Sequence, residues 1–340
     1  MSGPLPPWLA PVAWPASLAY GLAVRARELS IAGARPWMPP RPVISVGNVS
    51  AGGTGKSPMV RWICEALRAQ GRRPAIVIRG HRGGERSDEV LEHRSEMPEA
   101  PVAVGRDRRA SIERLLARDA SIDALVLDDG FQHRRVGRDL DLALVDASRP
   151  AIDGGLLPLG WLREPARALG RAHAVIVTRA GAVDDALVAR IERHHGREPT
   201  AWSRHAWDGL RVGSGADESR EALDWLRGRR VAVWAGIGNR EAFLEQVGLS
   251  GAHIVDAPQL PDHAAYSISS LADLAARSRA AGAAEVVCTA KDWVKLRTLP
   301  GPTGIRFARP CLRLDFLQGE SALRAMLVDA LARGDSRSTR

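Results

Sequence analysis

Short apolar runs alternate with longer segments of helical spacing through the first part of the chain. Runs of strand length lie at Val43–Val46, Ala75–Ile78, Ala124–Leu127, Leu142–Val145 and Ala174–Thr178. Apolar residues recur at helical intervals in Val60–Ala69, Ser111–Ala117 and Asp184–His194. Strands that alternate with helices predict a mostly parallel sheet covered by helices, which is an α/β fold.

A second, smaller α/β unit is predicted after this block. Its strand-like runs and helical patterns are Arg229–Ala235, Ile254–Val255, Glu285–Thr289, Arg240–Val247 and Ser267–Ala281. Two segments are expected to connect the units, Trp202–Val212 on the outward path and Ile305–Phe316 on the return. Ala322–Ala332 predicts a closing helix, and Gly334–Arg340 predicts a frayed tail.

The N-terminal segment is apolar and uncharged as far as Val24, and charge begins at Arg25. It lacks the basic region that precedes the apolar part of a cleaved signal peptide. Five prolines interrupt it, so we do not expect a straight spanning helix. We expect the segment to lie in a membrane interface, with Trp8 and Trp14 at head-group depth. The alternative is an apolar arm packed against the protein itself.

These patterns divide the chain into four parts: an N-terminal membrane-associating segment (1–35), a core lobe (36–205), a smaller α/β lobe with its connecting strands (206–318) and a C-terminal helix and tail (319–340). Three separated cysteines without a C-x-x-C pair indicate neither a disulfide framework nor a zinc site, and fit the cytoplasm. The net charge is +9, but the arginines are scattered and Tyr and Phe are scarce. We therefore expect no nucleic-acid partner, and nothing in the sequence indicates an obligate protein partner.

A candidate phosphate-binding loop, Ser50–Ser57, lies between a predicted strand and a predicted helix. The backbone N–H groups of Gly52, Gly53, Thr54 and Gly55 are expected to surround phosphate oxygens. Lys56 is expected to reach the β- and γ-phosphates of a nucleotide, and Ser57 to bind Mg²⁺. Only three of the 48 basic residues are lysines, which makes Lys56 distinctive. The strict motif has glycine where this chain has Ser50, and the alternative is a glycine-rich turn that binds nothing.

Two carboxylates, Asp128 and Asp129, follow the apolar run Ala124–Leu127. Ligands of open α/β sheets bind at the carboxyl ends of the strands, where the phosphate loop also opens. We therefore expect both aspartates to hold Mg²⁺, directly or through water. The alternative is an ordinary Asp-Asp-Gly turn.

Six segments together resemble the tetraacyldisaccharide 4'-kinases, the lipid A 4'-kinases. They are Gly47–Pro58, Asp128–His133, Leu156–Pro165, Gly236–Asn239, Pro261–His263 and Thr289–Leu296. The resemblance implies a P-loop NTPase-like α/β/α core lobe and a smaller α/β lobe joined by a two-stranded hinge. It also implies ATP- and Mg²⁺-dependent phosphorylation of the 4'-hydroxyl of a tetraacylated disaccharide 1-phosphate, giving lipid IVA, by an enzyme docked on the cytoplasmic face of the bacterial inner membrane.

The same resemblance implies a catalytic pair. Asp88 matches the family's base, Glu89 beside it is a further candidate Mg²⁺ ligand, and His263 matches a histidine that assists the aspartate. A neutral imidazole next to a carboxylate orients and tunes it. The alternatives are a solvated acidic pair in a loop and an ordinary turn histidine.

Several basic residues are left without a single role. Arg79, Arg82, Arg106 and Arg163 are candidates for the substrate's 1-phosphate or for surface ion pairs. Lys291 and Lys295 belong to the characteristic Thr289–Leu296 segment but receive no chemical role.

The alternative function is that of a ParA/MinD-like membrane-associated switch ATPase. Those proteins carry a second lysine just before the glycine pair, where this chain has Ala51.

Overall fold

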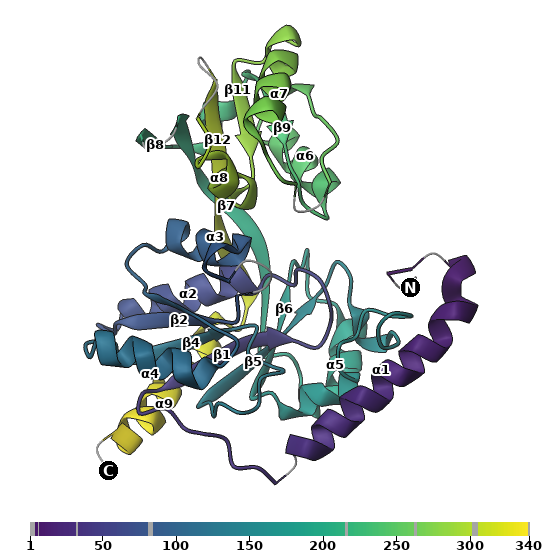
Figure 1. The fold of residues 1–340 in the computed structure, drawn as a ribbon, viewed down its shortest axis with the longest axis vertical. Coiled ribbons are helices and arrows are strands. Elements are labelled where there is room, and N and C mark those ends of the chain that lie inside the picture. The colour runs from purple at the N-terminus through teal and green to yellow at the C-terminus, as the bar shows by residue number, and fades with distance from the viewer. Residues whose placement is uncertain are drawn as a thin grey trace. The chain divides into compact units, whose positions relative to one another are not determined.

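The computed structural model describes residues 4–5, 7–31, 33–80, 84–214, 217–261, 264–300 and 305–338. The chain divides into two compact units, coloured along the chain in Figure 1. The core unit comprises Met1–His205 and Leu314–Arg340, and the small unit comprises Ala206–Arg313. β7 (Ala201–Ser214) and β12 (Arg306–Gln318) each have residues in both units.

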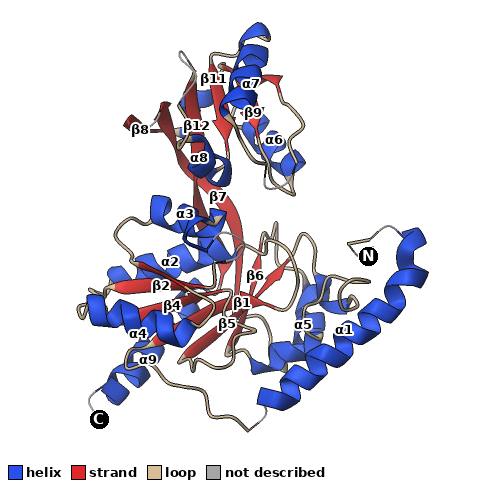
Figure 2. Ribbon diagram, viewed as in Figure 1, coloured by secondary structure: helices blue, strands red, loops and turns tan. Residues whose placement is uncertain are grey.

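A parallel sheet with the strand order β7-β6-β5-β1-β4-β2-β3 runs through the core unit. Its remaining strands are β1 (Val43–Asn48), β2 (Pro74–Ile78), β3 (Val102–Val104), β4 (Ala124–Asp128), β5 (Leu140–Asp146) and β6 (Ala174–Thr178). Helices cover both faces (Figure 2), so the central strands are buried along their whole length, as is usual for parallel sheets.

The two faces carry alternate side chains of each strand. On β1, Ile44 and Val46 belong to the cluster that includes α2 (Lys56–Arg68) and α9 (Glu320–Ser338). Val43 belongs instead to the cluster that includes α4 (Arg108–Arg118), and α5 (Asp185–His195) packs on β5 and β6. This period of two is what a strand buried on both sides requires.

The small unit contains four parallel strands and its own hydrophobic core. β10 (His253–Asp256), β9 (Arg230–Trp234), β11 (Glu285–Cys288) and β12 pair in parallel in that order, and β8 (Asp217–Glu221) pairs antiparallel with β7. α7 (Ile268–Ala280) and α8 (Ala290–Leu296) cover one face, and α6 (Arg240–Leu249) covers the other.

The predicted α/β fold with a mostly parallel sheet is confirmed, and two local expectations change. α3 (Asp88–Glu96) was not predicted, because its sequence has only two apolar residues and no helical stripe. The prediction of a frayed tail from Gly334 onward is wrong, since α9 continues to Ser338. Gly334 lies so close to Pro42 that a Cβ there would be 2.5 Å from the Pro42 Cα. Arg337 Nη2 also donates to Asp139 Oδ2 at 2.8 Å, which holds the last turn on the core.

α1 (Ala10–Ile31) is one helix that continues through Pro15, and one of its sides is hydrogen-bonded to the rest of the core unit. Ser17 Oγ donates to Leu156 O at 3.0 Å, and Tyr20 OH donates to Arg163 O at 3.0 Å. Ala13 is buried, and a Cβ on Gly21 would lie 3.2 Å from Leu156 Cδ1, so close apolar contact accompanies these hydrogen bonds.

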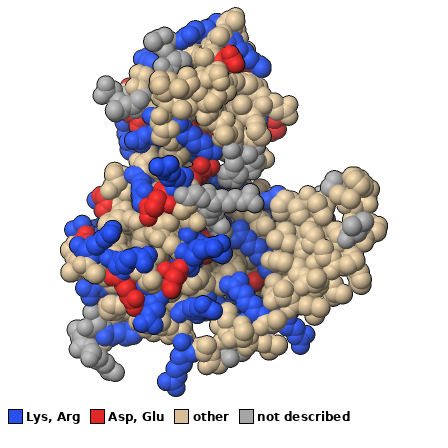
Figure 3. Space-filling model, viewed as in Figure 1, with Lys and Arg blue, Asp and Glu red and all other residues tan. Residues whose placement is uncertain are grey.

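An apolar stripe occupies another face of α1 and is exposed. It consists of Trp14, Leu18, Leu22 and Leu29, whose exposed fractions lie between 53% and 67%. Their spacing of four, four and seven residues places them on one side of the helix. The view in Figure 3 shows this part of the molecule almost free of charged side chains. Among the described residues, no helix has the length and hydropathy needed to cross a membrane.

Candidate functional site

The predicted phosphate loop joins the end of β1 to the start of α2. Gly52 has φ 102° and Gly55 has φ 81°, both in the left-handed region that favours glycine. Gly53 lies between them and is exposed. Thr54 is buried, and Thr178 Oγ1 donates to its carbonyl oxygen at 2.8 Å, which ties the loop to the end of β6. The glycines therefore permit a tight turn of the backbone between β1 and α2.

The start of α2 presents unbonded N–H groups next to this loop. Gly55 is the N-cap residue, and the first bond into the helix runs from Met59 N to Gly55 O at 3.2 Å. The N–H groups of Lys56 and Ser57 precede that bond, and Pro58 has no N–H to leave unsatisfied. A helix N-terminus of this kind is suited to binding phosphate.

The Lys56 side chain meets the aspartate motif at the end of β4. Lys56 Nζ donates to Asn48 Oδ1 at 3.3 Å and lies 3.5 Å from Asp129 Oδ1. β1 and β4 are neighbouring parallel strands, with Val46 opposite Asp128. Residues far apart in sequence are thus brought to one edge of the sheet, as ligand sites of α/β folds require.

Asp128 forms a buried ion pair with His93, a residue that sequence reasoning missed. His93 Nε2 and Asp128 Oδ2 are 2.8 Å apart, and the two side chains are 2% and 4% exposed. Burial alone lowers the pKa of His93 and raises that of Asp128. The mutual hydrogen bond and opposite charge outweigh burial, so the pKa of His93 is raised and that of Asp128 is lowered. The pair ties α3 to the end of β4.

Two arginines surround the same carboxylates. Arg108 is 1% exposed, and its Nη2 donates to the carbonyl oxygens of Asp128 and Asp129 at 2.5 and 3.0 Å. Burial lowers the pKa of Arg108 to about 10. Arg163 Nη1 lies 3.0 Å from Asp129 Oδ2. Burial raises the pKa of Asp129, but Lys56 and Arg163 outweigh it and lower that pKa. Asp129 is therefore ionised, and Arg163 faces the aspartates.

The remaining residues of the aspartate motif brace the phosphate loop. Gln132 Nε2 donates to Asn48 O at 2.6 Å. A Cβ at Gly47 would lie 2.5 Å from the Phe131 Cβ, so only glycine fits there. The Asn48 side chain in turn accepts a hydrogen bond from Lys56, so the motif helps to position the lysine through Asn48.

The donor set fits a magnesium ion bound largely by phosphate. Asp128 Oδ1 is buried and has no hydrogen-bond partner among the described residues, which is costly unless a ligand satisfies it. The described part of the chain holds no group of three or more His, Cys, Asp and Glu side chains that could enclose a metal. Mg²⁺ in kinases usually takes one or two carboxylates, and its other ligands are phosphates and waters. Asp128, Asp129 and Ser57 can supply the protein's share.

The predicted catalytic pair is placed only in part. Asp88 and Glu89 lie in the first turn of α3, the helix whose His93 contacts Asp128. They belong to a helix rather than to a solvated loop. His263 lies outside the described residues, as does Arg82.

The Thr289–Leu296 segment forms α8 with its N-cap and connects two loops of the small unit. Asp292 is fully buried and accepts hydrogen bonds from Gly236 N at 3.1 Å and Tyr266 OH at 2.9 Å. Lys295 Nζ donates to Ala264 O at 3.1 Å. The segment therefore fixes the loops that follow β9 and β10, which is a structural role for Asp292 and Lys295.

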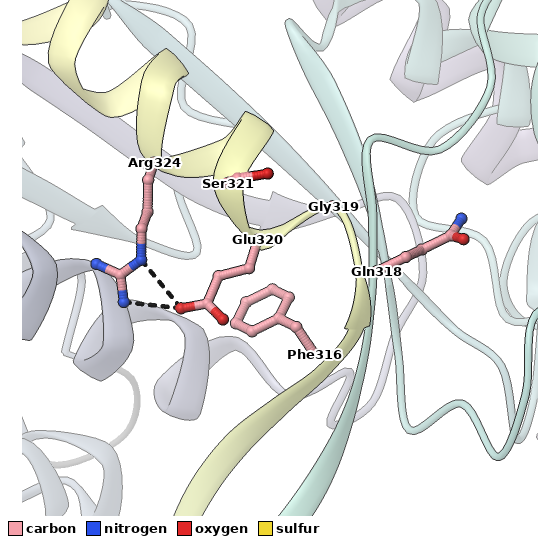
Figure 4. A pocket seen from close by; sticks show the side chains of 6 residues that line it. All are labelled: Phe316, Gln318, Gly319, Glu320, Ser321 and Arg324. Carbon is pink, nitrogen blue, oxygen red and sulfur yellow. Dashed lines mark hydrogen bonds and ion pairs between the residues drawn. The ribbon is translucent and has the colours of Figure 1, made fainter.

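A cavity of about 440 Å³ at the start of α9 contains none of these residues. Figure 4 shows Glu320 and Arg324 paired within it, beside Phe316. It is an open surface hollow whose charges neutralise each other, and we assign it no function.

His93 and Arg108 were missed because neither belongs to a short motif. His93 lies in an unpredicted helix, and its role depends on a contact 35 residues away in sequence. The only available signal was its position five residues after Asp88.

Comparison with known proteins connects this site to one family. The model of the family described as tetraacyldisaccharide-1-P 4'-kinase (LpxK) matches residues 9–332. The tetraacyldisaccharide 4'-kinase of Geobacter metallireducens is 36% identical over 86% of this chain and 90% of its own. That of Geobacter sulfurreducens is 36% identical over 93% of each chain.

A solved structure shares the fold. The crystal structure of LpxK from Aquifex aeolicus in complex with ATP has a TM-score of 0.70 and 24% sequence identity, and covers 94% of this chain and 98% of that chain. With the family model matching nearly the whole chain, the protein belongs to the tetraacyldisaccharide 4'-kinase family and is a kinase of lipid A biosynthesis.

Proposed function

We propose that the phosphate loop and the two aspartates bind ATP and Mg²⁺ for transfer to the 4'-hydroxyl of a tetraacyldisaccharide 1-phosphate. The observation that carries this proposal is the 3.5 Å approach of Lys56 Nζ to Asp129 Oδ1 beside the start of α2. The Aquifex aeolicus relative was crystallised with ATP, which supports the choice of nucleotide.

The residues of the site have separate tasks. The N–H groups of Gly53, Gly55 and Lys56 cradle phosphate oxygens, and the Lys56 ammonium neutralises the β- and γ-phosphates. Asp128, Asp129 and Ser57 hold Mg²⁺. A bound Mg²⁺ would supply positive charge against the negative charge that develops in phosphoryl transfer.

Phosphate transfer to the lipid tests this proposal. The full-length protein in detergent, given ATP labelled at the γ-position, is expected to label a tetraacyldisaccharide 1-phosphate, and chelation of Mg²⁺ is expected to stop labelling. Release of free phosphate at a rate that the lipid does not affect would contradict it and favour a switch ATPase.

Asp88 is proposed as the base that accepts the 4'-hydroxyl proton, with Glu89 as a further Mg²⁺ ligand and His263 as the partner of Asp88. α3 places Asp88 in its first turn, and the His93–Asp128 pair fixes this helix to the Mg²⁺ site. A base near the acceptor hydroxyl contributes about 10²- to 10⁴-fold in rate.

Asp88→Ala is accordingly expected to lower kcat by about 10²-fold or more and to leave the Kd for ATP nearly unchanged. Turnover and calorimetric ATP binding measure the two effects. Glu113→Ala, which removes an exposed carboxylate on α4, is the control. An equal loss of turnover and of ATP affinity would assign Asp88 to nucleotide binding.

The apolar stripe of α1 is proposed to lie in the membrane interface. Each large apolar side chain that leaves water contributes about 1.5–3 kcal/mol, and the polar contacts of Ser17 and Tyr20 keep the stripe facing away from the core. An outward-facing stripe supports a position at the cytoplasmic surface of the inner membrane, where we propose that the kinase meets its lipid substrate.

Replacing Trp14, Leu18 and Leu22 by Glu is expected to lower binding to anionic phospholipid vesicles by at least about 10-fold. Sedimentation with vesicles measures the bound fraction. The matched control replaces Ala16, Ala19 and Ala23 by Glu, because these exposed alanines lie outside the stripe and the change in charge is equal. Equal losses in the two variants would show that charge alone, and not the stripe, governs binding.

The two strands that pass between the units, β7 and β12, are proposed to act as a hinge. They are the described strands with residues in both units, which is the connection that a two-stranded hinge requires.

A further inference from the structure

Arg149 lies against the phosphate loop at Gly52. A Cβ on Gly52 would lie 2.8 Å from Arg149 Nη2, so the guanidinium occupies the space that a side chain at Gly52 would need. The φ of 102° at Gly52 independently disfavours any other residue. Glycine at this position therefore allows an arginine to reach the loop.

The guanidinium is oriented by an aromatic ring. The Arg149 Cζ lies 4.0 Å from the centre of the Trp161 ring. Trp161 O accepts a hydrogen bond from Ala51 N at 2.6 Å, and Arg163 N donates to Val49 O at 2.8 Å. The segment that carries Trp161 thus runs along the start of the phosphate loop and holds the stacked pair there.

Arg149 differs from its basic neighbours in lacking an anion. Arg163 pairs with Asp129 at 3.0 Å, and Arg179 pairs with Asp146 at 2.6 Å. Within the described residues, no carboxylate pairs with Arg149, although its backbone N–H donates to Asp146 O at 3.2 Å. Asp146 Oδ1 is taken by the N–H and hydroxyl of Ser148. The Arg149 guanidinium is exposed, stacks on an aromatic ring and lies beside a phosphate loop. A guanidinium in this setting is well placed to bind an anion.

We propose that Arg149 is a catalytic residue that contacts the transferring γ-phosphoryl group, as an arginine finger supplied by the chain itself. This inference rests on the proposed ATP site. Lys56 contacts the phosphates from the end of the loop where α2 begins. Arg149 approaches from the other end, at Gly52, so the two cations lie on either side of the loop. Arginines that neutralise the transferring group in this way accelerate phosphoryl transfer by large factors.

The step keeps ordinary phosphoryl-transfer chemistry. The γ-phosphorus forms a bond to the lipid 4'-oxygen as its bond to the bridging oxygen breaks, the electron pair stays on ADP, and the hydroxyl proton leaves to the base. Arg149 forms no covalent bond. It stabilises the charge on the equatorial phosphoryl oxygens, which is greatest in the transition state.

Arg149→Ala in the full-length protein is expected to lower kcat by about 10²- to 10³-fold. The KM values for ATP and lipid are expected to change by less than about threefold, as for a contact made only in the transition state. Arg149→Lys is expected to recover only part of the rate, because a lysine ammonium cannot donate the two parallel hydrogen bonds that a planar guanidinium donates. Arg193→Ala removes an exposed arginine from the last turn of α5 and is the control.

A binding measurement provides a readout other than turnover. Calorimetry is expected to show that Arg149→Ala binds ADP and Mg²⁺ as the wild type does, but loses the added affinity that fluoroaluminate, a mimic of the transferring phosphoryl, gives the wild type. Weaker ADP binding, a raised KM for lipid alone, or an unchanged kcat would each overturn the inference. A wild type that transfers no phosphate to lipid would instead contradict the proposed function.

Discussion

Lys56→Ala is expected to lower phosphoryl transfer to the lipid by about 10³-fold. The side chain is the one cation of the phosphate loop itself, and its amine is positioned by Asn48 Oδ1 at 3.3 Å and by Asp129 at 3.5 Å. Its removal takes away positive charge where the β- and γ-phosphates are proposed to bind, and leaves Asp129 with one cationic side-chain partner fewer. Both effects weaken binding of the nucleotide and of the transition state.

Transfer of labelled phosphate to the lipid measures this loss. Lys56→Arg keeps the charge but not the compact ammonium, and is expected to remain well below the wild type. Lys291→Ala removes another of the three lysines from the small unit and is expected to keep near-normal activity. A Lys56→Ala enzyme with more than about a tenth of the wild-type rate would exclude Lys56 from the site.

Asp128→Leu is expected to destabilise the protein by about 3–5 kcal/mol and also to abolish activity. The change removes the partner of a buried imidazolium, and His93, at 2% exposure, has no access to water as a substitute. Replacing both residues, as Asp128→Leu with His93→Leu, is expected to restore much of the stability but none of the activity, because a well-packed apolar pair leaves no charge stranded.

Urea unfolding at about pH 6 is the measurement, since there the pair is complete in the native state. The pKa of His93 is raised in the folded protein. Its contribution to the stability of the fold is therefore full at pH values below its pKa in the unfolded chain, and is lost as pH rises through its pKa in the folded protein. The pKa of Asp128 is lowered in the folded protein. Its contribution to the stability of the fold is therefore present at pH values above its pKa in the unfolded chain, and is lost as pH falls through its pKa in the folded protein. A double variant no more stable than Asp128→Leu alone would show that the pair is not the source of the loss.

The sequence predicted the parts of this molecule that depend on local pattern. The strands of the core unit are uniform apolar runs, and the phosphate loop is a contiguous motif, so both could be located from residues near one another. The Asp128–His93 pair, the Arg108 contacts and the Arg149–Trp161 stack could not, because each joins residues from separate elements that only the fold brings together.

The end of α9 shows the same limit. Gly334 near the C-terminus favours fraying by composition, but its missing side chain is what lets the helix lie against Pro42. The outward-facing stripe of α1 is a different case. The apolar composition of this segment was evident, but which side faces away from the core depends on Ser17 and Tyr20.

The hydrogen bonds that Ser17 and Tyr20 of α1 donate end on Leu156 and Arg163, in the same segment that carries Trp161. The helix that we propose to lie in the membrane interface is thus joined to the segment beside the proposed nucleotide-binding loop, with only a few residues between. With α1 in the interface as proposed, an acceptor sugar has no need to leave the head-group layer to be phosphorylated. For such an enzyme the effective substrate concentration is two-dimensional, set by the mole fraction of acceptor among the surrounding amphiphiles, and dilution with inert detergent slows turnover even when the total amount of acceptor is constant.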